Sequence, residues 1–122
     1  MLKTTKKQLI TLFKQLGVKK GDTVLIHTSI LSLGKLEGGL KAFHQALLSL
    51  LSNQGNIIVP TFTYSFRRKK IFNINTSNCC KSIGVYPEYF RNLKDAVRSA
   101  DPLFSMCCIG PDANILMRRE SN

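Results

Sequence analysis

The fold is decided by the stretch Gly21-Asp22-Thr23-Val24-Leu25-Ile26-His27-Thr28-Ser29-Ile30-Leu31-Ser32-Leu33-Gly34. It opens on a turn, continues as the apolar run Val24–Ile26, and ends among small polar residues. A short, continuously apolar run is typical of a buried strand. Gly34 and the pair Gly38-Gly39 then predict a glycine-rich loop ahead of the next element.

A basic helix is predicted before this stretch, over residues 4–17. Thr4 and Thr5 can cap its N-terminus, and Gly17 is a suitable residue to end it. A second helix is predicted from Leu40 to Ser52. Each helix carries an apolar stripe, formed by Leu9, Phe13 and Leu16 on the first and by Phe43, Leu47 and Leu51 on the second. Because each stripe needs a packing partner, we expect these two stripes to be the apolar surfaces most at risk of exposure.

A second buried strand is predicted at Ile57–Val59, stopped by Pro60. The order strand, helix, strand implies a right-handed β-α-β unit with parallel strands. The fold class predicted is therefore α/β, with a mainly parallel sheet and flanking helices. Further along, the sequence predicts a loop over residues 73–84, a short helix over Pro87–Leu93, and a third strand over Phe104–Ile109.

Residues 1–122 are interpreted as a single partial domain with a frayed tail at 118–122. No apolar run approaches the roughly 18 residues that a membrane span needs, and no secretory signal is recognised, so we expect a cytoplasmic protein without a membrane partner. The four cysteines form the adjacent pairs Cys79-Cys80 and Cys107-Cys108. Zinc ligands are usually spaced more widely, so reduced thiols and no metal site are expected.

The chain carries 18 Lys and Arg against 7 Asp and Glu, a formal net charge of +11. Such a surplus favours anionic partners: nucleic acid, anionic lipid or a phosphorylated cofactor. Nucleic-acid binders gather their basic residues on one face, whereas this charge is spread and Arg67–Lys70 is its one dense run. A non-catalytic basic module that binds nucleic acid or another polyanion is the alternative function.

Candidate functional residues lie where the two predicted strands end. His27, Thr28 and Ser29 follow the first, and Thr61 and Tyr64 follow the second. Ligands of open α/β sheets bind beyond the carboxyl ends of strands, where backbone N–H groups of a glycine-rich loop can approach a phosphate. From the residues alone, other interpretations stay open: a plain tight turn at the glycines, and His27 as a hydrogen-bonded core residue. Phe62 and Tyr64 can likewise be core residues, with the threonines present as strand formers. No catalytic triad or acid/base pair is identifiable.

Three segments in order resemble the aminoglycoside 3-N-acetyltransferase family. The first is residues 21–34 with Gly38-Gly39, the second is residues 55–66, and the third runs from Gly84 to Gly110 around Arg98-Ser99-Ala100-Asp101-Pro102. The resemblance covers about residues 20–113 and identifies the chain as the truncated N-terminal part of a larger acetyltransferase fold. This family transfers acetyl from acetyl-CoA to an amine of an aminosugar, in antibiotic resistance among other settings.

The resemblance implies site residues of two kinds. The coenzyme A cleft would be lined by His27, Thr28, Ser29, Ser32, Leu33 and Gly34, and the acceptor would lie near Thr61, Tyr64 and Asp101. In the family the catalytic base is a histidine in the C-terminal half, and nothing after Asp112 resembles that half. The catalytic residues are therefore unknown, and we expect no activity from the chain alone.

The expected partners are an aminosugar or aminoglycoside and either a missing C-terminal half or a second copy of the chain. Two departures from the family pattern bear on the acceptor. Asp101 stands where many members have His, as in a subgroup associated with bacterial surface-polysaccharide sugars, and Lys94-Asp95 replaces a Pro-Gly turn.

Overall fold

The computed structural model of the protein describes residues 3–27, 34–62, 73–75, 77–79, 85–101 and 104–118. The elements in chain order are β1 (Lys3–Thr4), α1 (Lys6–Gln15), β2 (Thr23–Leu25), β3 (Lys35–Leu36), α2 (Gly39–Leu51), the 3-10 helix η2 (Ser52–Gln54), β4 (Asn56–Pro60), α4 (Tyr86–Arg91), β5 (Val97–Arg98), β6 (Met106–Ile109) and α5 (Ala113–Leu116). Among these helices, none has the length and apolar character of a membrane span.

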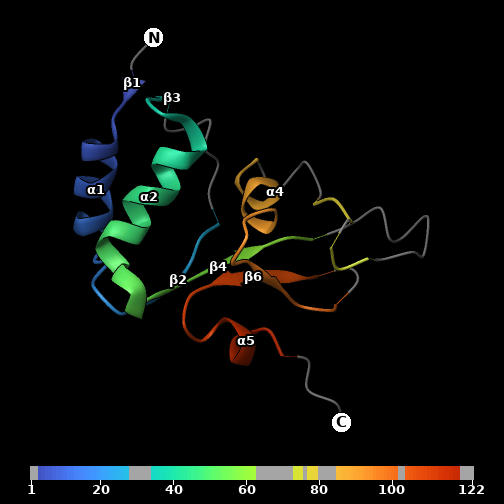
Figure 1. The fold of residues 1–122 in the computed structure, drawn as a ribbon. Coiled ribbons are helices and arrows are strands. Elements are labelled where there is room, and N and C mark those ends of the chain that lie inside the picture. The colour runs from blue at the N-terminus through green and yellow to red at the C-terminus, as the bar shows by residue number, and fades with distance from the viewer. Residues whose placement is uncertain are drawn as a thin grey trace.

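The main sheet has four strands in the order β2-β4-β6-β5, and β1 and β3 form a separate parallel pair. Strands β2 and β4 are parallel, as the β-α-β prediction required, with Val24 opposite Ile57. Strand β6 is antiparallel to both β4 and β5. Figure 1 shows α2 and α4 above this sheet and α5 below it. The α/β class with flanking helices is confirmed.

The expectation of a mainly parallel sheet is wrong for the described strands, because the sheet is mixed. The parallel pair β2–β4 is joined by a helical crossover, as parallel strands require. Strands β5 and β6 are separated by only a short connection, too short for a crossover, so they can pair only as antiparallel neighbours.

Helix α1 begins and ends where the sequence predicts. Thr5 is its N-cap: the Thr5 hydroxyl accepts from the Gln8 backbone N–H, and the Gln8 side chain accepts in return from the Thr5 N–H. This capping box satisfies two helix-end donors at once. After the C-cap residue Leu16, Gly17 adopts the left-handed conformation that ends many helices.

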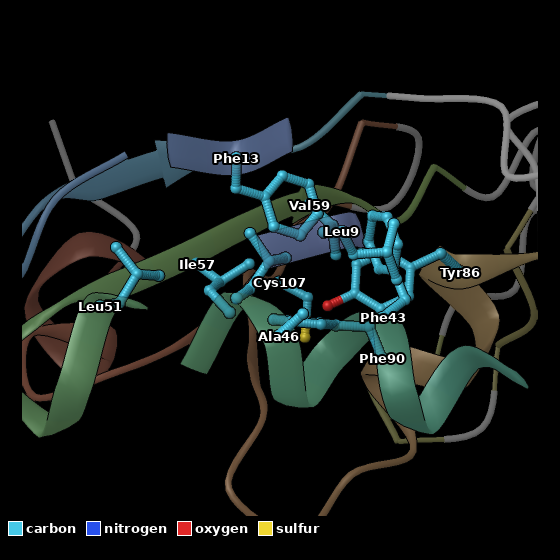
Figure 2. Packing of buried hydrophobic residues seen from close by; sticks show 11 residues of the cluster. Leu9, Phe13, Phe43, Ala46, Leu51, Ile57, Val59, Tyr86, Phe90 and Cys107 are labelled. Carbon is cyan, nitrogen blue, oxygen red and sulfur yellow. The ribbon is translucent and has the colours of Figure 1, made fainter. Parts of the chain in front are cut away.

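The core lies between the helices and one face of the sheet (Figure 2). Phe13 of α1 meets Phe43 of α2 edge-on, with ring centroids 5.4 Å apart, and Phe43 meets Tyr86 of α4 at 4.9 Å. From the sheet, Ile57 and Val59 point into the same cluster. The apolar stripes of α1 and α2 are thus each other's partners rather than exposed surfaces.

The exception within those stripes is Leu16, which is 72% exposed. Strand β2 also differs from its prediction. Leu25 is 62% exposed, so β2 is not a buried strand. Among the described residues it lies at the edge of the sheet and pairs only with β4. An apolar run indicates that a strand is suited to burial. Whether its side chains are buried depends on a neighbouring segment that the tertiary structure places over them.

His44 of α2 is a buried residue of the core. Its Nδ1 atom lies 2.8 Å from the Tyr86 hydroxyl, and its ring packs edge-on against Phe90. Burial lowers the pKa of His44 and raises the pKa of Tyr86, so both side chains are neutral near pH 7.

Candidate functional site

The candidate site lies at the sheet edge where β2 and β4 end. Parallel pairing brings these two carboxyl ends to the same edge, and the Ile26 N–H donates to the Ile58 carbonyl at 2.8 Å just before the strands finish. Because β6 is antiparallel to β4, its first residues start at this edge too. His27, Thr61 and Ser105 are therefore delivered to one side of the sheet by three different strands.

A buried polar network holds the end of β4. Thr61 and Ser105 are both fully buried, and their side-chain oxygens lie 3.0 Å apart. The Thr61 N–H donates to the Ser105 carbonyl at 2.9 Å, and the Ser105 hydroxyl donates to the Thr61 carbonyl at 2.7 Å. The predicted acceptor residue Thr61 thus has its hydroxyl engaged within the protein. Its contact with a substrate stays a prediction.

Arg98 lies at the centre of this network, and only 7% of the residue is exposed. Its Nη2 donates to the Thr61 carbonyl at 2.7 Å, and its Nε donates to the Ser105 hydroxyl at 3.1 Å. Its Nη1 reaches the Ser77 carbonyl in the segment before α4. One guanidinium therefore joins three chain segments, which fixes the strand ends beside the candidate site. Burial lowers the pKa of Arg98 from a very high ordinary value, so it stays charged.

A second ionic group fastens the segment 73–79 to α4. Arg91 forms a salt bridge with Glu88 at 2.6 Å, and Glu88 also accepts from the Cys79 N–H at 2.9 Å. Arg91 donates further to the Asn75 carbonyl and the Asn78 side chain. Burial alone would raise the pKa of Glu88, but the hydrogen bonds from Arg91 and Cys79 outweigh it and hold that pKa below its usual range.

Asp101 lies in an exposed turn between β5 and β6. Its Oδ1 accepts from the Phe104 N–H at 2.8 Å, and Ser99 accepts from the Met106 N–H at 2.9 Å. Asp101 also lines a pocket of about 220 Å³ together with Arg118. An exposed carboxylate beside a small pocket can attract an ammonium group, so the predicted role of Asp101 at the acceptor is chemically reasonable and stays a prediction.

The predicted coenzyme A loop is described only at its two ends. His27 is exposed and lines an apolar groove of about 480 Å³, so it is not the core histidine that remained an open interpretation. Gly34 is exposed, with a φ of 76°. Thr28, Ser29, Ser32 and Leu33 lie outside the described residues, as does Tyr64 of the acceptor set. The roles of these residues stay predictions.

The buried thiols are unreactive. Burial raises the pKa of Cys79 and of Cys107 to about 12, and that of Cys108 to about 11, so none carries a thiolate near neutral pH. In the ranges that the structure describes, no group of three or more His, Cys, Asp or Glu side chains could hold a metal ion.

Comparison with known proteins places this fold among N-acetyltransferases. The family model described as aminoglycoside 3-N-acetyltransferase matches residues 25–122. The chain belongs to this family, which uses acetyl-CoA. Among its relatives, an SPbeta prophage-derived aminoglycoside N(3')-acetyltransferase-like protein, YokD of Bacillus subtilis, is 27% identical over 94% of this chain. Aminoglycoside N(3)-acetyltransferase IV of Salmonella is 32% identical over 88% of this chain.

Solved structures agree with the sequence comparison. The crystal structure of YokD from Bacillus subtilis superimposes with a TM-score of 0.88, covering 97% of this chain and 54% of that one. Aminoglycoside acetyltransferase AAC(3)-IVa superimposes at 0.87 with 29% identity, covering 96% and 45%. The chain thus spans about half the length of the relatives it matches, 50% of YokD and 40% of the Salmonella enzyme.

Sequence reasoning missed the central role of Arg98. The residue stands in the quoted run Arg98-Ser99-Ala100-Asp101-Pro102, yet an arginine in a loop-flanked strand normally indicates a solvated surface. Ser105 and Asn56 were missed as well, because polar side chains are mostly exposed. Asn56 is fully buried and joins β4 to Thr23 and to Asp112, at 3.1 and 3.0 Å. A polar residue inside an apolar pattern was the available signal.

Proposed function

We propose that this chain is the N-terminal, coenzyme-A-binding part of an aminosugar N-acetyltransferase of the cytoplasm, and that it transfers no acetyl group by itself. The observation that carries this proposal is the family match over residues 25–122 in a chain that spans about half of its relatives. The fold in Figure 1 supports it, since β2, the helix α2 and β4 form a β-α-β unit, and open α/β sheets in general bind ligands beyond the carboxyl ends of their strands.

In this proposal, acetyl-CoA lies against the loop that joins β2 to α2. His27 and Gly34 at the ends of that loop, with Thr28, Ser29, Ser32 and Leu33 between them, line the cleft. Glycines near the start of α2 leave backbone N–H groups accessible to an anionic group. Arg98 fastens the end of β4 to the start of β6, and β2, from which the loop departs, is paired with β4 up to the hydrogen bond from the Ile26 N–H to the Ile58 carbonyl.

The acceptor in this proposal is an amine of an aminosugar. Structures of AAC(3)-IVa with a His-to-Ala substitution are described as complexes with a gentamicin and with apramycin. Asp101, with Thr61 and Tyr64, is proposed to lie on the acceptor side. Acetyl transfer also needs a base for the ammonium and a donor for the tetrahedral oxyanion. Since His44 is buried against Tyr86, it is not available as that base.

The test has two parts. The chain is first incubated with acetyl-CoA and a panel of aminosugars that includes gentamicin and apramycin, and thiol release is followed. We expect none, whereas turnover at the roughly 1 to 10³ per second typical of enzymes would refute the claim of inactivity.

The second part is coenzyme A binding followed by NMR. We expect weak binding, with a dissociation constant near or above about 1 mM, because only part of the cleft is present. Amides of His27 and of Gly34 to Leu36 should shift. Shifts confined to Arg67–Lys70 would place the anion elsewhere and support the polyanion-binding alternative.

One observation favours that alternative. The register of the β1–β3 pair sets Lys3 directly beside Lys35, which concentrates positive charge at one end of the molecule. Titration with a short single-stranded oligonucleotide separates the two functions. Contacts to phosphates weaken steeply with salt, so the acetyltransferase proposal expects no binding at about 0.2 M salt. Oligonucleotide binding that persists at this salt concentration would support the alternative.

A further inference from the structure

We propose that the open edge of β2, together with the apolar groove beside it, is the surface on which the other half of an acetyltransferase of this family docks by adding a strand to the sheet. The β2 groove is defined by Leu12 of α1 and its C-cap residue Leu16, by Val24, Leu25 and Ile26, and by Phe43 of α2. This inference rests on the proposed function and names the surface that makes the chain part of a larger fold.

Within the described residues, the backbone of β2 has a paired strand on one side only. The Asn56 N–H donates to the Asp22 carbonyl, and the Ile26 N–H donates to the Ile58 carbonyl, so residues 22 and 26 face β4. Backbone groups of alternate residues in a strand face opposite edges. Those of Thr23 and Leu25 therefore face away from β4, where the described part of the chain supplies no further strand.

The side chains at this edge are equally open. Leu25 is 62% exposed and Leu16 is 72% exposed, the two largest exposures of apolar side chains along the groove. The groove between α1 and β2 has a volume of about 480 Å³ and reaches Phe43 in the core. A strand laid along β2 would bond Thr23 and Leu25 through its backbone. Its alternate side chains would then fill the groove over Leu16.

Strand β2 is only three residues long, which is one protection of a free edge, but it lacks the chemical ones. Free edges are normally blunted by lysine, proline, an inward-pointing charge or a bulge. Thr23 to Ile26 contains no charged residue and no proline, and its register with β4 is regular over three consecutive residues. An edge of this kind is suited to a permanent neighbour rather than to solvent.

The occupant is the polypeptide that corresponds to the unmatched half of the relatives. This chain superimposes on YokD with a TM-score of 0.88 while covering 54% of it, so about half of that protein is left to cover surfaces open here. A second copy of this chain is disfavoured by charge, since two chains of +11 repel each other. A partner of lower or opposite charge meets no such penalty.

The experiment mixes the 122-residue chain with the part of YokD that lies outside the match, and measures the complex by light scattering and by titration. Two variants, Leu25→Lys and Leu16→Lys, put a charge on the groove at positions already exposed, so the fold is retained, as circular dichroism checks. The matched control is Ile115→Lys, because Ile115 is 67% exposed but lies on α5, below the sheet in Figure 1.

We expect a one-to-one complex that Leu25→Lys and Leu16→Lys each weaken at least about tenfold and that Ile115→Lys leaves unchanged. In the complex, hydrogen exchange at the Thr23 and Leu25 amides should slow markedly, whereas the Ile26 amide, already bonded to β4, should change little.

Three outcomes overturn the proposal: no complex with the YokD segment, a complex indifferent to both groove variants, or a wild-type homodimer that the groove variants abolish. The proposed function is tested separately, by measuring whether the complex binds added coenzyme A. A groove-dependent complex that fails to bind coenzyme A would refute the proposed function and leave the docking surface standing. Coenzyme A binding by the chain without a groove-dependent complex would refute the docking surface and leave the proposed function standing.

Discussion

Replacing Arg98 by methionine tests whether one buried guanidinium fixes the end of β4. Methionine has a similar length and no hydrogen-bonding group. It removes the donors to the Thr61 carbonyl at 2.7 Å, to the Ser105 hydroxyl at 3.1 Å and to the Ser77 carbonyl. The variant therefore removes the link from these strand ends to Ser77, while Thr61 and Ser105 stay bonded to each other.

The expected loss in the free energy of unfolding follows from the groups that lose a hydrogen-bond partner. Hydrogen bonds to charged groups contribute about 1.5–3 kcal/mol each. The loss of three such hydrogen bonds is offset in part, because the substitution also removes the cost of burying a charge. In addition, the Ser105 hydroxyl still donates to the Thr61 carbonyl at 2.7 Å. We expect the free energy of unfolding to fall by about 2–3 kcal/mol.

Urea unfolding followed by circular dichroism measures the change. With a slope of about 1–3 kcal/mol/M, the midpoint should fall by about 1–2 M. Arg98→Lys keeps the charge but not the fork of donors and should recover less than half of the loss. The matched control Lys41→Met, at an exposed position on α2, should stay within about 0.5 kcal/mol of the native chain. A loss for Arg98→Met no larger than that of the control would refute the reasoning.

Three further outcomes are expected. Gly110→Ala should cost about 2–4 kcal/mol in urea unfolding, because the added Cβ would lie 2.2 Å from the Asn56 Oδ1, whereas Gly17→Ala, with open space around it, should cost only about 1–2 kcal/mol of backbone strain. Because burial lowers the pKa of His44, its contribution to stability is complete above the ordinary pKa of about 6.5 and is lost as the pH falls below it. Thermal melts should therefore show a drop between about pH 7.5 and 5 that His44→Gln reduces; an unchanged drop would exclude His44 as its source. In analytical centrifugation the chain alone should associate only weakly and non-specifically, at high concentration and in salt that screens its net charge of +11, and the two groove variants should not abolish this association. A monodisperse monomer melting above about 60 °C would contradict this.

Parts of the fold, and one position of the candidate site, were predictable because they depend on residues close together in the chain. Thr5 caps α1 and Gly17 follows its C-terminus, as short-range hydrogen bonding and glycine conformation dictate. The position of His27 at a strand end followed from the apolar run before it. The packing of Phe13 against Phe43 was not predicted, because a stripe states only that a helix needs a partner and not which element supplies it.

The sequence alone determined the family and the helices and strands of the β-α-β unit, since these depend on periodicity and on residues close together in the chain. It also predicted which strand ends carry the candidate site. Only the tertiary structure decided that the sheet is mixed, that Arg98 lies buried among Thr61, Ser105 and Ser77, and that β2 is an open edge. Each of these is set by contacts between segments that are distant in the sequence, or by a neighbouring strand that the described chain does not supply, and no local pattern records such contacts.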